Sequence, residues 1–146
     1  MLSRSSRSFL SARMQPKFVP GPPRHLNEAR IPTVDRKTFS LMWNGRNQID
    51  ITLEDRVSRY TFPMLLGRDG AKFVSCFRDG GMVTLTSASE DSPPLELRVG
   101  SDKGLLYFSM KGDSGTITTG LGPGEAALAN SLVCFADRQR IMRSFR

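Results

Sequence analysis

The stretch LLYFSMKGDSG, residues 105–115, places side chains of two chemical kinds in alternation. Read as a strand, it turns Tyr107, Ser109 and Lys111 to one face and leucine, phenylalanine and methionine to the other. An exposed ring near a cation can stack on the bases and neutralise the phosphates of a single-stranded nucleic acid. The same residues also fit a tyrosine packed beneath a second layer and a lysine in solvent. The local pattern leaves both interpretations open.

Further cations and one further ring fit the same hypothesis. Arg98 points away from its apolar strand neighbours, and Lys103 lies in the turn that follows. Trp43 is a second ring, although its alternation with other apolar residues also fits a core position. The candidate nucleic-acid-binding residues are therefore Tyr107, Lys111, Arg98, Lys103, Arg59, Arg46 and Trp43.

Acid–base and nucleophilic chemistry find few suitable groups in the chain. The only histidine, His25, lies in a proline-rich stretch where no packing would hold it. Asp50, Glu54 and Asp55 cluster on a polar strand face and its turn, which fits either a paired-carboxylate site or a solvated face. The two cysteines lie far apart, and no zinc pattern exists. We therefore expect no enzyme, no catalytic residue, no metal and no cofactor.

Most of the net charge of +7 belongs to the amino terminus. Residues 1–30 hold six Lys/Arg against one acid, a charge of +5. Residues 31–146 hold fifteen basic and thirteen acidic residues, which leaves only +2. The basic isoelectric point is therefore weak evidence for a basic folded domain.

Residues 1–18 are rich in arginine and serine and space Leu2, Phe9 and Leu10 among their charges. These features are typical of an organellar transit peptide and predict import into the mitochondrial matrix. A disordered basic arm that binds RNA or a partner is the alternative. No apolar run reaches the ~18 residues needed to span a bilayer, so no membrane partner is expected.

The rest of the chain divides into a linker and one domain. Residues 19–33 contain four prolines and a glycine, which predicts an extended linker or arm. Residues 34–146 fit a single domain, since domains commonly hold about 100–150 residues.

Alternating apolar and polar residues predict strands through most of this domain. Turn residues separate them, among them Asn44-Gly45. Pro63 lacks an amide donor, so its strand lies at an edge or ends there. Each strand is apolar on one side only, which indicates antiparallel sheets with one buried face. The expected strands span 37–45, 48–54, 59–64, 82–88, 95–100, 105–112 and 116–120.

Two segments have helical spacing instead. Residues 67–81 predict a short helix of about two turns that ends at Gly80. Residues 123–145 predict a long closing helix that covers the apolar face of the sheet. Its apolar stripe comprises Leu128, Leu132, Phe135, Met142 and Phe145, with Ala129, Val133 and Ala136 beside it.

These elements give an expected α+β class, with about seven to eight antiparallel strands, a short mid-chain helix and a long C-terminal helix packed on the apolar face. Strands followed by a helix occur twice, over residues 37–79 and 82–145, which forms a weak internal repeat of order without sequence identity.

The order of elements resembles the Whirly fold, a family of plant organellar single-stranded DNA-binding proteins and kinetoplastid mitochondrial proteins that bind guide RNA. The matching residues are LELRVGSDKGLLYFSMKGDSGTITTGLGPGEAALANSLVCFADRQRIMRSF, 95–145, where three strands and a long final helix follow one another as in the family. SRYTFPMLLGRDGAKFVSCF, 58–77, looks like the family's mid-chain strand and helix. The family's Lys-Gly-Lys-Ala-Ala-Leu stretch is absent, and SLMWNGRN stands nearest to its place.

The resemblance implies two four-stranded sheets with helices, tetramers of like or related subunits, and single strands bound across the sheets. The start MLSRSSRSF also looks similar to kinetoplastid mitochondrial presequences, which favours RNA over DNA. We therefore expect a mitochondrial single-stranded RNA-binding protein that acts in RNA processing or editing, as an oligomer or within a larger ribonucleoprotein complex. The alternative is a non-catalytic structural subunit of a mitochondrial ribosome or RNA-processing complex that works through protein contacts.

Overall fold

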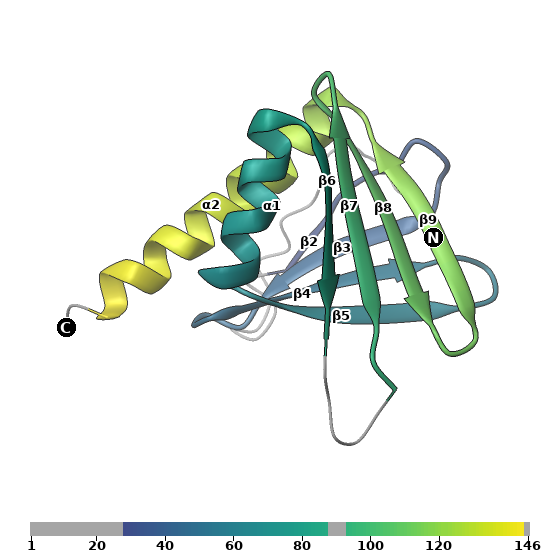
Figure 1. Ribbon diagram of the computed structural model, residues 1–146, viewed down its shortest axis with the longest axis horizontal. Helices are drawn as coiled ribbons and strands as arrows, with labels where there is room; N and C mark the ends of the chain where they lie inside the picture. The colour runs from purple at the N-terminus through teal and green to yellow at the C-terminus, as the bar shows by residue number, and fades with distance from the viewer. Residues whose placement is uncertain (1–27, 88–92, 145–146) are drawn as a thin grey trace, which may run out of the picture.

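The described chain repeats one succession of elements, four strands followed by a helix (Figure 1). The computed structural model describes residues 28–87 and 93–144, so the expected targeting segment, 1–18, lies outside the described residues. The first group comprises β2 (Glu28–Arg30), β3 (Thr38–Trp43), β4 (Gln48–Glu54), β5 (Arg59–Leu65) and α1 (Arg68–Asp79). The second group comprises β6 (Gly81–Thr86), β7 (Glu96–Asp102), β8 (Leu105–Gly112), β9 (Gly115–Leu121) and α2 (Pro123–Ser144).

Each group of strands forms an antiparallel sheet in chain order, β2-β3-β4-β5 in the first sheet and β6-β7-β8-β9 in the second. The turn residues that the sequence indicates between β3 and β4 form the turn in the structure. The Asn44 side chain accepts hydrogen bonds from the N–H groups of Arg46 and Gln48, and Gly45 has a φ of 83°. Pro63 lies in the edge strand β5, as its missing N–H requires. The expected α+β class is confirmed.

The apolar faces of the two sheets pack against each other. The rings of Phe39 in β3 and Phe108 in β8 have centroids 4.8 Å apart, and Phe73 of α1 stacks on Phe108 at 6.1 Å. All three rings are buried, and each such burial stabilises the fold by about 1.5–3 kcal/mol. Figure 1 shows the strands of the two sheets crossing, with α1 and α2 together at one end. The other face of each sheet is therefore turned outward.

The long helix α2 packs on this core, but through a different stripe from the expected one. Phe135 is 50% exposed and Met142 59%, whereas Leu128 and Leu132 are partly buried. Phe145 lies outside the described residues. Each sheet covers most of the apolar face of the other, because a sheet offers a broader apolar surface than one helix. Helix α2 therefore packs on the core over a smaller area, through small side chains that allow a close approach. The buried side chains of α2 are Ala126, Ala129, Val133 and Ala136.

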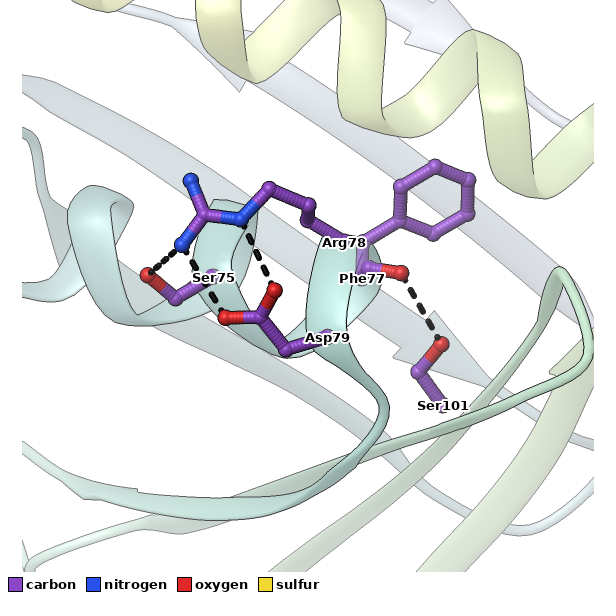
Figure 2. A network of polar contacts seen from close by, with 5 residues as sticks. All are labelled: Ser75, Phe77, Arg78, Asp79 and Ser101. Atoms are coloured by element: carbon purple, nitrogen blue, oxygen red, sulfur yellow. Dashed lines mark hydrogen bonds and ion pairs between the residues drawn. The ribbon is translucent and has the colours of Figure 1, made fainter.

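Helix α1 spans 12 residues, longer than the two turns expected, and ends at Gly80, whose φ is 82°. Figure 2 shows this end of the helix. The Ser101 hydroxyl of β7 donates to the Phe77 carbonyl at 3.4 Å, which ties the helix to the second sheet. On the outer side, Arg78 donates to the Asp79 carboxylate at 2.9 Å. No helix in the described part of the chain is long and apolar enough to cross a lipid bilayer.

The folded body begins before residue 34, where the sequence places the start of the domain. Residues 28–30 pair with β3, although they belong to the expected linker. Ile31 is buried, and its N–H donates to the Phe39 carbonyl at 3.0 Å. A three-residue strand between prolines carries too little alternation to be predicted, and its pairing with β3 supplies the stability.

A contact between Tyr60 and Gly112 joins the two sheets at the β8–β9 turn. The Tyr60 side chain points inward from β5, and its hydroxyl lies 2.5 Å from the Ser114 hydroxyl. The ring lies directly over Gly112, where a Cβ would meet three ring carbons at 3.0 Å or closer. Position 112 therefore has room only for glycine.

Replacing Gly112 by alanine should lower the free energy of unfolding by about 1–3 kcal/mol, because the Tyr60 ring must shift to make room. Urea denaturation followed by circular dichroism measures the change. The matched control is Gly124→Ala in the first turn of α2, where a Cβ would meet nothing within 4 Å. That variant should be as stable as the parent or up to about 1 kcal/mol more stable. Equal stability of the two variants would contradict the contact.

Candidate nucleic-acid interface

The outward face of the second sheet centres on Tyr107, which is 49% exposed. In the register of the sheet, Gly100 of β7 and Gly120 of β9 lie directly beside it. Neither neighbour has a side chain, so no cross-strand partner covers the ring from within the sheet. Of the two interpretations that the sequence leaves open, the structure places Tyr107 outside the core.

A groove of about 550 Å³ borders this ring. Gly100 and Gly120 contribute the backbone at its base, and the side chains of Met82 in β6 and Val34 before β3 line it from either side. Both side chains are largely exposed, Met82 to 71%. Apolar walls beside an exposed ring suit a flat, planar ligand such as a nucleobase.

Two predicted cations follow the same face along β7 and β8. Arg98 is exposed, and its Nε lies 3.8 Å from the Glu96 carboxylate. Lys111 is exposed on β8, directly across from Glu96 in the register. Lys111 has no ion pair among the described residues. Its ammonium is therefore available to an anionic ligand.

Lys103 lies at the tip of the β7–β8 hairpin in a backbone conformation that lysine seldom adopts. Its φ is 53°, and the φ of the following Gly104 is 83°. Two-residue hairpin turns of this kind favour Asn or Asp before Gly. A lysine there has a conformational cost, and such local strain is a reason to suspect a functional role. The tip adjoins the end of the sheet that carries Tyr107.

The other three predicted residues do not share this face. Arg59 lies on the outward face of the first sheet, on the far side of the sandwich from Tyr107. Trp43 points inward at the end of β3, where its ring meets Phe135 edge-on with centroids 6.2 Å apart. The Trp43 indole N–H donates to the carbonyl of Arg46 in the exposed β3–β4 turn at 3.2 Å. These contacts give Trp43 a packing role.

The segment of residues 33–37 covers the free edge of β9, a contact that sequence reasoning missed. The Val34 N–H donates to the Gly120 carbonyl at 2.9 Å, and the Lys37 ammonium donates to the Thr118 carbonyl at 2.6 Å. These bonds occupy carbonyls of an edge strand and fix Val34 beside the groove. The turn residues 33–37 are visible in the sequence, but their target 81 residues away is not.

Asp35 anchors the same segment through its carboxylate. The Thr119 hydroxyl donates to Asp35 at 2.6 Å, and the Lys37 ammonium lies 3.1 Å away. Desolvation acts to raise the pKa of Asp35, but the hydrogen bond from Thr119 and the bond and charge of Lys37 outweigh it, so the pKa lies below its ordinary value. The ionised carboxylate therefore stabilises the docked segment at neutral pH.

The charges on the outward face nearly balance. Arg98, Lys103 and Lys111 are offset by Glu96 and Asp102 on the same strands. Each phosphate contact to a single strand adds only about 0.7 to the salt dependence, so three cations supply a moderate electrostatic contribution. Stacking, at about 1–3 kcal/mol per base, would have to provide most of the affinity.

The acids considered for catalysis have local structural roles. Asp55 closes the β4–β5 turn by accepting from the N–H groups of Val57 at 2.8 Å and Ser58 at 2.7 Å. The bonds from Ser58 and Val57 hold the pKa of Asp55 below its usual value. Asp50 accepts from the Gln48 amide at 2.7 Å. Within the described residues, no three metal-ligating side chains of the His, Cys, Asp and Glu kinds come together.

Comparison of the chain with known protein families, curated proteins and solved structures finds no match in any of the three. Function is therefore inferred from the chemistry of the face around Tyr107 and from the sequence.

Replacing Thr119 by valine should raise the pKa of Asp35, because the carboxylate loses a hydrogen-bond donor. NMR titration of the Asp35 carboxyl carbon measures the shift. The pKa of Asp35 in the parent lies below the ordinary value of an aspartate, and the pKa in the variant should move up toward that ordinary value. Thr119→Val should be less stable than the parent at neutral pH. This difference in the free energy of unfolding should shrink as the pH falls through the pKa of Asp35 in the parent, because Asp35 is then protonated in both proteins.

The matched control is Thr118→Val, whose side chain lies on the opposite face of β9 and should leave the pKa of Asp35 unchanged. An equal Asp35 pKa in the parent and in Thr119→Val would show that the hydroxyl does not anchor the segment.

Proposed function

We propose that this protein binds single-stranded nucleic acid, with RNA favoured over DNA, on the outward face of its second sheet. The observation that carries the proposal is the half-exposed Tyr107 ring between two glycines, beside a groove with apolar walls. A base stacked on this ring would lie in the groove against Met82. Arg98, Lys103 and Lys111 would then face the phosphates of the backbone.

The cost of this arrangement to the free protein supports a ligand. Glycine weakens the interior of a strand, and cross-strand pairs of side chains are what stabilise a sheet. At the row of Tyr107 the sheet forgoes such pairs on both sides of the ring. A stacked base would supply the contact that the neighbouring strands do not.

The choice of RNA and of the mitochondrion comes from the sequence. The resemblance to the Whirly family favours a single-stranded ligand, and the arginine- and serine-rich start favours mitochondrial import. On this proposal the protein acts in RNA processing or editing in the matrix, beside like or related subunits. The two four-stranded sheets, each followed by a helix, agree with the fold that the resemblance implies.

A second function, as a structural subunit that works through protein contacts, is favoured by α2. Phe135, Ile141 and Met142 are exposed to 50%, 41% and 59%. Large apolar side chains gathered on one helix are typical of a contact surface. The mass of the native particle with and without nuclease separates the two functions. A particle that nuclease leaves intact, built from a chain that binds no strand alone, supports this second function.

Tyr107→Ala should weaken binding of a short labelled RNA about tenfold or more, because one stacked base contributes about 1–3 kcal/mol. Tyr107→Phe retains the ring and should bind nearly as well as the parent. Fluorescence anisotropy titration measures both variants. Unchanged affinity in Tyr107→Ala would remove the ring from the site, and circular dichroism confirms that each variant is folded.

Replacing both Arg98 and Lys111 by glutamine should flatten the dependence of affinity on salt, by roughly 0.7 in the logarithmic slope for each lost phosphate contact. Lys103→Asn tests the hairpin cation separately, because asparagine suits the turn and removes the charge. Arg59→Gln, on the far face, is the control and should leave the slope unchanged. An equal slope in the double variant and the parent would exclude these cations.

A further inference from the structure

We infer that the bound strand runs along β8 and seats two of its bases, one at each end of the outward face, with one unseated nucleotide between them. The register rests on the proposed function, since it assumes that this face binds a strand.

The first seat is the groove beside Tyr107. Its ring and the Met82 side chain offer two flat or flexible apolar surfaces, and Gly100 leaves the space between them free. A Cβ at position 100 would meet Met82 and Tyr107 at 3.9 Å, an ordinary contact, so a side chain there would occupy the space that a base would take.

The second seat is a separate hollow of about 310 Å³ on the same face, near the far end of β8. Pro93, Pro94 and Leu95 contribute apolar atoms to it, and Lys111 contributes a cation. Proline rings are rigid and present a flat apolar surface at little entropic cost. A hollow of this size with a rigid apolar wall can hold a second base.

The acidic residues of this hollow set a base preference. Glu96 and Asp113 also line it, and their carboxylates only accept hydrogen bonds. Adenine, cytosine and guanine carry an exocyclic amino group with two N–H donors for such acceptors, whereas uracil offers only its single N3–H. The second seat should therefore take a base with an amino group, with Lys111 toward the phosphate.

Two residues that mark the seats, Tyr107 and Lys111, are spaced along β8 like two nucleotide steps. Residues on one face of an antiparallel strand repeat every ~6.8 Å, which is close to the distance between successive phosphates in an extended single strand. Tyr107 and Lys111 lie two such repeats apart, with Ser109 between them and Arg98 beside Ser109. Ser109 and Arg98 also line the groove of the first seat, and they offer a hydroxyl and a guanidinium but no ring, which suits sugar and phosphate.

An RNA path across the β-strands, from β7 over β8 to β9, fits the charges less well than a path along β8. Beyond β9 the RNA would meet Asp35 and Lys37, whose charges are already paired at 3.1 Å. Along β8 the RNA would meet Arg98 of the neighbouring β7 and then Lys111. The path along β8 therefore ends at Lys111, which has no ion pair among the described residues, whereas the path across β9 meets a lysine that is already paired.

The test uses the full chain and triadenylate, with an abasic residue at the first, the middle or the last position, in NMR titrations. An abasic residue at either end should weaken binding about tenfold, the loss expected for one stacked base, and the middle one should change it little. An equal loss at all three positions, or the largest loss in the middle, overturns the register. Failure of every trimer and of a longer RNA to shift the Tyr107 signals overturns the proposed function instead.

Gly100→Val assigns the seats, because a branched side chain fills the first seat and β-branched residues suit a strand. In this variant, removing the base at one end should no longer weaken binding, and removing the base at the other end should still do so. Triuridylate should bind the parent more weakly than triadenylate. Penalties that persist at both ends in Gly100→Val, or equal binding of the two trimers, contradict the assignment.

Discussion

The meeting of three phenylalanine rings between the two sheets determines which surfaces this protein offers to a partner. Phe39, Phe73 and Phe108 come from the first sheet, from α1 and from the second sheet, and their burial joins the three elements into one core. The alternation of side chains along a β-strand then determines which residues of β8 face outward. Because Phe108 points inward, its neighbours Tyr107 and Ser109 point outward. The exposed ring of the proposed site is thus a consequence of the core.

Glycines shape both faces of β8 and its neighbours, for different reasons. On the inner side, Gly112 makes room for the Tyr60 ring, which joins the first sheet to the β8–β9 turn. On the outer side, Gly100 and Gly120 leave the Tyr107 ring without cross-strand partners. The first arrangement gains packing between the sheets. The second gives up cross-strand packing within a sheet, which a base stacked on Tyr107 would replace if the proposed function holds.

The proposed binding face and the exposed side of α2 are separate surfaces. The binding face belongs to the outward side of the second sheet, whereas Phe135 and Met142 belong to the helix beside the crossing of the sheets (Figure 1). Strand binding and contact with another subunit are therefore compatible in one molecule. The near balance of charge around Tyr107 also suits a subunit that shares a strand with neighbours, because each copy needs to add only a modest electrostatic contribution.

The sequence by itself determined the features that depend on one element at a time. Alternation placed Tyr107, Arg98 and Lys111 on polar strand faces, and the missing N–H of Pro63 placed β5 at an edge. Only the tertiary structure decided the features that depend on distant residues meeting. The tertiary structure buried the small side chains of α2 in place of the stripe that contains Phe135 and Met142. It also brought residues 33–37 to the edge of β9 and placed Arg59 on the face far from Tyr107. The physical reason is that a period of two or 3.6 residues defines the sides of an element only relative to itself, whereas the partner of each side follows from how closely separate surfaces can pack.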